Sequence, residues 1–414
     1  MIKSIIYRLL ILAIVTSSCN NSGKKTSDSN PTDSLTQGSF VYDLNFLKQH
    51  DDSLIVLSND SGLAQVVVSP KYQAKVFTST ADGGSGKSFG WVNYKAFAGT
   101  TDTHMNAYGG ENRLWLGPEG GKFSLFFKPD SPMVFANWKT PASFDTEPWK
   151  VVDKNDESVT MQKNMQLINY KGTSLNVAVR RSVKILSNAD IAQRLALSLD
   201  TPVKAVAYQT DNVITNNGSS AWSEATGMPC IWMLDMFTPS PATVIIVPYK
   251  NLSGQSFNKV VTSDYFGQIP LDRLKYSDDK LFLKADGKSR GKLGVAPEYA
   301  KTVAGSYDPQ HKVLTIIMYD LDSSAKYLNQ EWNTTKPAFS GDAVNAYNDG
   351  PLADGTQMGP FYEMESVSPA AFLKPGESLS HKHAVFHFTG DEKGLDVIAQ
   401  KLLGVSLGAI QKEF

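Results

Sequence analysis

The stretch SHKHAVFHF, residues 380–388, alternates polar and apolar side chains in the way that is typical of a β-strand. Successive side chains of a strand point to opposite faces. One face of this segment is apolar and consists of Ala384, Phe386 and Phe388. The other face carries half of the six histidines of the chain, namely His381, His383 and His387. The apolar face predicts contact with a hydrophobic core, so we expect the histidine face to point away from that core.

A second strand is predicted shortly before this one, in the segment FYEMES at residues 361–366. The same alternation places Glu363 and Glu365 on one face of that strand. The connection of residues 368–379 is long enough for the two strands to lie as antiparallel neighbours or near neighbours. In that arrangement two carboxylates and two imidazoles line one concave surface.

This arrangement admits three interpretations. An acid–base site needs a carboxylate and an imidazole whose pKa values are tuned apart, and its candidate catalytic residues are Glu363, Glu365, His381 and His383. A metal site needs at least three converging ligands, which His381, His383 and Glu365 would supply. The third interpretation is an ordinary strand with a polar, solvated face.

The chain from residue 40 onward consists mainly of short β-branched runs between turn residues, for example 175–186, 243–249 and 312–319. A short helix is predicted at residues 44–50, and the clearest helix begins after Asp391 and ends at Gly404. The sequence therefore predicts an all-β fold. We expect one domain, residues 40–414, built as a large antiparallel β-sandwich with few short helices and a C-terminal helix.

The N-terminal residues 1–18 have the features of an export signal, because a basic start precedes an apolar run that ends on small residues. Residues 16–19, TSSC, resemble the lipobox of bacterial lipoproteins. That resemblance implies a lipoprotein signal peptide and lipidation of Cys19. The alternative is plain secretion with Cys19 as an incidental thiol.

Residues 19–39 are expected to form a flexible tether, since they contain a single apolar side chain, Leu35, after the cysteine. A lipid anchor attaches a soluble domain to a membrane without spanning it. In lipoproteins of this type an acidic run after the cysteine marks surface display, whereas here Lys24 and Lys25 follow. We therefore expect an anchor in the outer membrane with the domain facing the periplasm.

The net charge of −1 and the lack of a basic stripe argue against nucleic acid as a partner. The segment DGGSGKSF, residues 82–89, is similar to a phosphate-binding loop, but Ala81 occupies the position of a required glycine. No cofactor is predicted.

A second group of polar side chains lies among glycines in residues 102–127, and its candidate substrate-binding residues are His104, Glu111, Arg113, Trp115 and Glu119. An arginine can donate paired hydrogen bonds to a sugar ring, and a nearby indole offers an apolar face. The alternative is a structural Arg–Glu pair in a hairpin. Asn348 and Asp349 complete the candidate set, although Asn-Asp-Gly is also a common turn sequence.

Three segments in this order carry a resemblance: GGENRLWLGPEGG (109–121), IWMLDMFTPSPATVIIVPY (231–249) and the stretch from NAYND to SHKH (345–383). They resemble a family of uncharacterised Bacteroidetes lipoproteins related to the galactose mutarotase-like (aldose epimerase-like) supersandwich proteins. The resemblance implies a β-supersandwich whose concave sheet holds a mono- or oligosaccharide.

In aldose epimerases a glutamate acts as base, a histidine as acid, and an arginine lies near the sugar. The resemblance therefore implies that Arg113 is that arginine, Glu363 or Glu365 the base, and His381 or His383 the acid. The epimerase glutamate usually follows the histidine strand, whereas here both glutamates precede it. An epimerase-like enzyme, a non-catalytic glycan-binding lipoprotein and a metal-dependent site at His381 and His383 all stay open.

Overall fold

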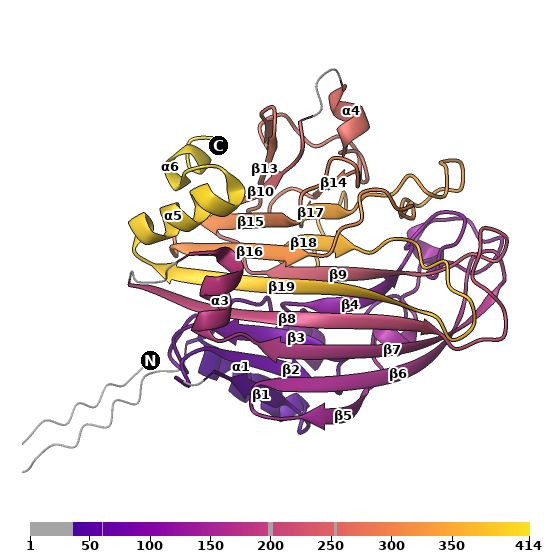
Figure 1. The fold of residues 1–414 in the computed structure, drawn as a ribbon, viewed down its shortest axis with the longest axis horizontal. Helices are drawn as coiled ribbons and strands as arrows, with labels where there is room; N and C mark the ends of the chain where they lie inside the picture. Colours follow the sequence, from indigo (N-terminus) through magenta and orange to yellow (C-terminus); the bar gives the residue numbers. More distant parts are fainter. Residues whose placement is uncertain (1–35, 60, 198–201, 252–254) are drawn as a thin grey trace, which may run out of the picture. The chain divides into compact units, whose positions relative to one another are not determined.

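The computed structural model describes residues 36–59, 61–197, 202–251 and 255–414 (Figure 1). They form three antiparallel β-sheets with a few short helices, so the predicted all-β sandwich is confirmed. The predicted signal peptide, Cys19 and most of the predicted tether lie outside the described residues. No helix in the described ranges is both long and apolar enough to cross a bilayer.

The largest sheet has ten strands. In spatial order they are β12 (Leu274–Tyr276), β13 (Lys280–Lys284), β10 (Val244–Pro248), β15 (Val303–Asp308), β16 (Val313–Tyr319), β19 (Ser378–Gly390), β8 (Val203–Asn216), β7 (Ser174–Ile185), β6 (Ser158–Ile168) and β5 (Lys150–Lys154).

The second sheet has six strands, and a third has three. The six-stranded sheet runs in the order β11 (Val261–Thr262), β14 (Gly291–Val295), β17 (Val344–Asn348), β18 (Tyr362–Val367), β9 (Cys230–Phe237) and β4 (Arg113–Gly117). The three-stranded sheet consists of β1 (Ile55–Ser58), β2 (Gln65–Ser69) and β3 (Lys75–Thr80).

The helices are short and lie between or outside the sheets. They are α1 (Phe40–His50), α2 (Tyr94–Ala98), η1 (Phe135–Asn137), η2 (Ala142–Phe144), α3 (Asn188–Leu195), α4 (Phe257–Val260), α5 (Glu392–Leu403) and α6 (Leu407–Ile410). The helix predicted at residues 44–50 begins earlier, at Phe40. The predicted C-terminal helix is confirmed as α5, which follows Asp391 and ends at Gly404, whose φ of 68° lies in the left-handed region that favours glycine.

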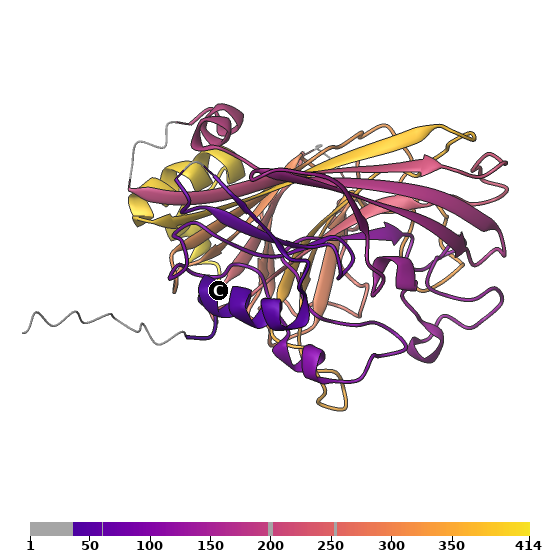
Figure 2. The same cartoon turned by 90° about the horizontal axis from the view of Figure 1, so that it is seen from below.

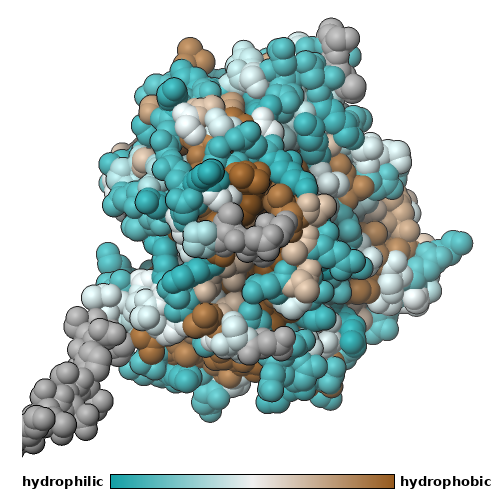
Figure 3. Space-filling view, turned by 60° about the vertical axis from the view of Figure 1, so that its left-hand side comes forward, coloured by the Kyte–Doolittle hydropathy of each residue, from teal (hydrophilic) through white to brown (hydrophobic). Residues whose placement is uncertain are grey.

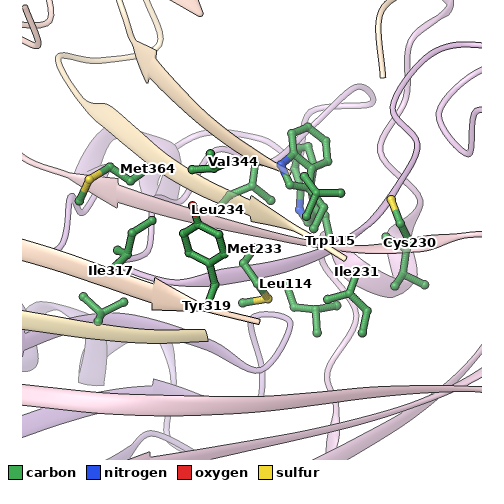
Figure 4. Packing of buried hydrophobic residues seen from close by; sticks show 14 of the residues in the cluster. Leu114, Trp115, Cys230, Ile231, Met233, Leu234, Ile317, Tyr319, Val344 and Met364 are labelled. Carbon is green, nitrogen blue, oxygen red and sulfur yellow. The ribbon is translucent and has the colours of Figure 1, made fainter. Parts of the chain in front are cut away.

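Apolar side chains cover both faces of the ten-stranded sheet. Helices α3, α5 and α6 pack on one face through Ile191, Leu395, Leu403 and their neighbours (Figure 1). The opposite face is turned toward the other sheets (Figure 2). Figure 4 shows Ile317 and Tyr319 of β16 in this inner core, near Met364 of β18 and Met233 of β9.

The surface at the end of the domain that carries α5 and α6 is mainly hydrophilic, with separate apolar areas (Figure 3). A hollow of about 280 Å³ near the C-terminus is lined by residues that include Val244, Lys284 and Phe414. None of the candidate site residues lines it.

β19 lies inside the ten-stranded sheet, between β16 and β8. Its apolar face packs under the helices, as expected. The prediction that its histidine face points away from the core is wrong, since the exposed fractions of His381, His383 and His387 are 0%, 1% and 1%. The six-stranded sheet covers that face, so both faces of β19 are core.

β18 and β19, whose connection is long enough for them to lie as antiparallel neighbours or near neighbours, do not pair with each other. β18 pairs with β17 and β9 in the six-stranded sheet, whereas β19 belongs to the ten-stranded sheet. The connection between them carries the chain from one sheet to the other. The two strands therefore meet through side chains across the inner core and not through backbone hydrogen bonds.

Candidate functional site

The alternation of β18 separates its side chains into two sets. Tyr362 and Ser366 point toward the ten-stranded sheet, because the Tyr362 hydroxyl contacts Ser306 Oγ at 2.8 Å and Ser366 Oγ contacts two histidines of β19. Glu363 and Glu365 consequently point to the opposite side. We call this side of the six-stranded sheet, which faces away from the ten-stranded sheet, the outer face.

The register of the six-stranded sheet brings further side chains to the outer face, because residues opposite each other on paired strands share a side. Glu365 is opposite Leu234, which in turn is opposite Arg113. Glu363 is opposite Tyr347, which is opposite Lys292. Two residues further along β4, Trp115 is opposite Trp232.

Arg113 and Glu363 form a hydrogen-bonded pair on the outer face. The Arg113 Nη2 atom donates to Glu363 Oε1 at 2.6 Å, and the exposed fractions of the two side chains are only 7% and 9%. Burial raises the pKa of Glu363 to about 8, because the loss of solvation outweighs the opposing effect of Arg113, and Glu365 adds a second, repulsive charge. A carboxyl in this environment can hold or release a proton near neutral pH.

Glu365 has a different set of contacts two residues further along the strand. Its Oε2 atom accepts hydrogen bonds from Lys292 Nζ at 2.7 Å and from Trp232 Nε1 at 2.8 Å. The Lys292 ammonium also lies 4.8 Å from the centre of the Trp232 ring, within the range of a cation–π contact. Side chains from β14 and β9 therefore fix one oxygen of the Glu365 carboxylate.

Two polar atoms of this group have no hydrogen-bond partner among the described residues. They are Arg113 Nε, a donor, and Glu365 Oε1, an acceptor, and both are buried. A buried polar group without a partner costs free energy, so such atoms need an explanation. A ligand that carries both hydroxyl hydrogens and hydroxyl oxygens would satisfy the two.

Aromatic rings adjoin the charged groups. The Arg113 guanidinium lies 5.0 Å from the centre of the Trp115 ring, and Trp115 packs at 5.6 Å, edge on, against Trp232. At the other side, Arg290 Nε donates to the Tyr347 hydroxyl at 3.3 Å. Charged groups between indole and phenol rings are the combination expected for a ligand that is polar at its edges and apolar on its faces.

Two more predicted residues adjoin the outer face. Burial raises the pKa of Glu119 to about 6, against the opposing charge of Lys292. Asp349 accepts a hydrogen bond from the Tyr347 hydroxyl at 3.1 Å, and burial raises its pKa as well. The hydrogen bond places Asp349 beside Tyr347, and the charge of Lys292 acts on Glu119.

Three predicted substrate-binding residues lie elsewhere. Glu111 points into the inner core, where Ser79 and His387 contact its Oε1 atom at 2.7 and 3.0 Å. Asn348 anchors a turn, since its Oδ1 atom accepts from the backbone of Gly287. The half-buried His104 ring stacks on Phe135 with 4.7 Å between ring centres. None of the three contacts the Arg113–Glu363 pair.

The two histidines predicted as acids do not share a surface with the glutamates. His381 and His383 contact Ser366, on the side of β18 opposite to Glu363 and Glu365. The expectation that Glu365 could complete a metal site with them is therefore wrong. Over the described part of the chain, no cluster of three or more His, Cys, Asp or Glu side chains is arranged to hold a metal ion.

Sequence reasoning missed Lys292, Trp232 and Tyr347 as members of the site. Trp232 is buried, and its indole N–H is directed at Glu365. Lys292 sits in the short strand GKLGV, between Gly291 and Gly294. Only the strand register joins these residues to Glu363.

Solved structures resemble the chain in fold. Slr1438 from Synechocystis sp. PCC 6803 is 12% identical, with 81% of this chain and 96% of that chain covered and a TM-score of 0.51. A galactose mutarotase-like protein from Lactobacillus casei is 12% identical, covering 81% and 100%, with a TM-score of 0.47. A galactose mutarotase related enzyme from Lactobacillus acidophilus is 9% identical, covering 81% and 97%, with a TM-score of 0.44.

At these identities the likeness concerns the fold alone. No curated protein sequence matches the chain. One family does match, over residues 38–414, and it is described as a family of unknown function, DUF6786. The chain belongs to this family.

Proposed function

We propose that the outer face is a carbohydrate-directed site that performs acid–base chemistry at the anomeric centre of a sugar. The observation that carries the proposal is the buried Arg113–Glu363 pair beside Trp115, with a second glutamate, Glu365, on the same face. Two carboxyls in different environments can take the roles of acid and base. The resemblance of residues 109–121 and 345–383 to mutarotase-like lipoproteins supports the same class of ligand.

The roles follow from the contacts of the two glutamates. Below pH 8 or so Glu363 holds its proton and can donate it to the ring oxygen of a pyranose, because burial raises its pKa to about 8. Glu365 Oε1, which lacks a protein partner in the described chain, can accept the proton of the anomeric hydroxyl. The ring C–O bond then breaks, the aldehyde forms, C1 rotates, and reclosure with the reverse proton transfers gives the other anomer.

The test is anomer interconversion measured by NMR exchange on a panel of sugars. Glu363→Gln and Glu365→Gln keep the shape of each side chain, and each is expected to lower the rate about 10²- to 10⁴-fold. Glu157→Gln, at an exposed glutamate in the turn after β5, is the matched control and should leave the rate unchanged. A wild-type protein that accelerates interconversion of no sugar in the panel would contradict the proposal.

A non-catalytic glycan-binding protein is the second candidate. The position of the histidines favours it, because none of the three in β19 reaches the outer face and the histidine acid of the epimerases is missing there. This candidate predicts calorimetric binding that survives Glu363→Gln but falls on Trp115→Ala or Arg113→Met. If a sugar binds and its turnover depends on Glu363, the result supports the enzyme over the non-catalytic binding protein.

We also propose that the domain is held at the outer membrane, facing the periplasm, by lipid on Cys19 as in the Bacteroidetes lipoproteins that the sequence resembles. The support is the order of residues 1–19, in which a basic start, an apolar run and small residues precede the cysteine. Mass spectrometry of the N-terminal peptide is expected to show acylated Cys19, and Cys19→Ala should release the protein from membranes. A secreted wild-type protein with a free Cys19 thiol would contradict this.

A further inference from the structure

A second polar group lies between the two large sheets, behind the strands that carry the outer face. We call it the inner polar layer, and its members are Asn112, Arg181, Asn212, Asp235, Ser366, His381 and His383. All are buried, with exposed fractions of 0% or 1%. Burying this many polar groups is unfavourable unless they satisfy one another, so their contacts need a reason.

The first half of the inner polar layer runs from the ten-stranded to the six-stranded sheet. Arg181 Nη2 donates to Asn112 Oδ1 at 2.5 Å, and Arg181 Nη1 donates to Asn212 Oδ1 at 2.8 Å. Asn112 Nδ2 donates to Asp235 Oδ1 at 2.5 Å. Asp235 Oδ2 accepts from His383 Nε2 at 2.7 Å. The guanidinium, two amides, the carboxylate and the imidazole thus form one continuous chain of hydrogen bonds.

Ser366 continues the chain, because its Oγ atom lies 2.8 Å from His383 Nδ1 and 2.8 Å from His381 Nε2. One assignment of protons satisfies every contact. His383 donates from Nε2 to Asp235 and accepts the Ser366 proton at Nδ1, while His381 donates from Nε2 to Ser366. In this assignment His381 Nδ1 carries an unpaired lone pair. If His381 instead carried its proton on Nδ1, a buried N–H would be left without an acceptor, which costs more free energy. Burial also lowers the pKa of His381 to about 3, so this ring is neutral.

Each member on the six-stranded sheet is the immediate chain neighbour of an outer-face residue. Asn112 precedes Arg113, Asp235 follows Leu234, and Ser366 follows Glu365. Adjacent residues of a strand point to opposite sides and share one peptide unit. A displacement of the inner side chain therefore moves the outer one.

We propose that Asp235, His383 and Ser366 are positioning residues that hold Arg113, Glu363 and Glu365 in place from behind the sheet. None of the three touches the outer face. Asp235 and Ser366 act through β9 and β18, which carry outer-face residues, and His383 acts through its contacts with Asp235 and Ser366. This assigns the histidine strand a role in the site without contact to a sugar. The effect of these three residues on sugar binding rests on the proposed function, whereas their effect on the outer-face side chains does not.

The test uses the indole N–H resonances of the seven tryptophans as reporters across a pH titration. Trp232 Nε1 donates to Glu365, and Trp115 lies beside Arg113. The charged and titratable groups that face Glu363 are Arg113, Glu365, Lys292, Asp349 and Tyr347. The variant Glu363→Gln identifies the transition that belongs to Glu363 itself.

Ser366→Ala and Asp235→Asn are the test variants. We expect each to shift the midpoint of the Glu363 transition by about 0.5 pH unit or more, since the distance from Arg113 changes. Thr160→Val is the matched control. It removes a buried hydroxyl whose partner, Ser182 at 2.9 Å, belongs to the same ten-stranded sheet. It should lower the melting temperature without moving the midpoint.

Indole titrations that are the same in wild type, Ser366→Ala and Asp235→Asn would overturn the proposal, even if both variants melt earlier, because the layer would then be structural only. A sugar that binds to wild type should bind more weakly to Ser366→Ala and unchanged to Thr160→Val. If no sugar binds to wild type, the proposed function fails, and the indole titration still decides whether the inner polar layer positions the outer face.

Discussion

The outer face and the inner polar layer are two buried polar groups on opposite sides of the same strands. In the inner polar layer Asp235 and Ser366 have hydrogen-bond partners and exposed fractions of 0%. On the outer face the side chains of Arg113 and Glu363 keep 7% and 9% of their surface exposed, and Arg113 Nε has no partner in the described residues. In the described residues the inner polar layer leaves His381 Nδ1 unpaired, whereas the outer face leaves Arg113 Nε and Glu365 Oε1 unpaired beside partly exposed side chains. We infer from this difference that the inner polar layer positions the strands and that the outer face binds the ligand.

The largest effect is expected from a substitution that disrupts the inner polar layer. Asp235→Ala removes the acceptor of both Asn112 and His383 and leaves a buried amide and a buried imidazole N–H unpaired. We expect a loss of about 3–5 kcal/mol in the free energy of unfolding, measured with urea. Asp278→Ala, at an exposed aspartate, should change it by less than about 0.5 kcal/mol. Equal effects of the two substitutions would mean that the layer is not a connected network.

The pH dependence of stability sharpens the contrast on the outer face. Burial raises the pKa of Glu363 from 4.5 to about 8, so between these values the folded state keeps a proton that the unfolded state has released. Stability from this group is present below pH 4.5 and is lost as pH rises toward 8. Glu119 and Asp342, with pKa values raised to about 6, have the same sign.

The difference between wild type and Glu363→Gln isolates Glu363. Between pH 6 and 8 the wild type should lose up to about 1.4 kcal/mol more per pH unit than the variant, in urea unfolding curves recorded at successive pH values. A stability of wild type that does not fall relative to that of the variant over this range would contradict the raised pKa, because Glu363 would then be ionised in both the folded and the unfolded state.

A smaller effect on stability is expected from the loss of the hydrogen bond that the Trp232 indole donates to the Glu365 carboxylate. Trp232→Phe removes the hydrogen bond to Glu365, and it should destabilise by about 1.5–3 kcal/mol beyond the loss of ring volume. Trp149→Phe makes the same change in volume but removes a bond to the backbone carbonyl of Ser143, for which about 0.5–1.5 kcal/mol is expected. Thermal and urea unfolding of both variants give the comparison. The Glu365 contact is unimportant if Trp149→Phe costs as much.

The smallest effect is expected at the surface. Lys326 and Glu224 form an ion pair in which both side chains are more than half exposed. Lys326→Met should lower the free energy of unfolding by less than about 1 kcal/mol, since exposed ion pairs contribute little. A loss as large as that of Trp232→Phe would show that burial does not separate the two kinds of contact in this protein.

The alternation of residues 380–388 predicted a strand and its apolar face, but it did not say what covers the other face. That depends on the position of β19 inside a sheet that is packed on both sides, which is a property of the whole chain. The same alternation placed Glu363 and Glu365 on a shared face correctly. It could not show that the histidines contact Ser366, which points between the sheets, instead of Glu365.

Arg113 was predicted near the substrate, and the structure brings it to Glu363 across 250 residues of sequence. No local pattern shows this contact, because it depends on the register of β4, β9 and β18. Lys292 and Tyr347 were missed for the same reason. Glu111 and Asn348 were included because they stand among glycines or turn residues, yet their side chains satisfy the fold instead.

The most direct test of the central claim is a crystal structure of the protein with the sugar that binds best in a calorimetric panel. We expect a sugar on the outer face, with hydroxyls within hydrogen-bond reach of Arg113 Nε, Glu363 and Glu365 Oε1 and no contact with His381 or His383. A sugar bound elsewhere, or held by those histidines, would contradict it.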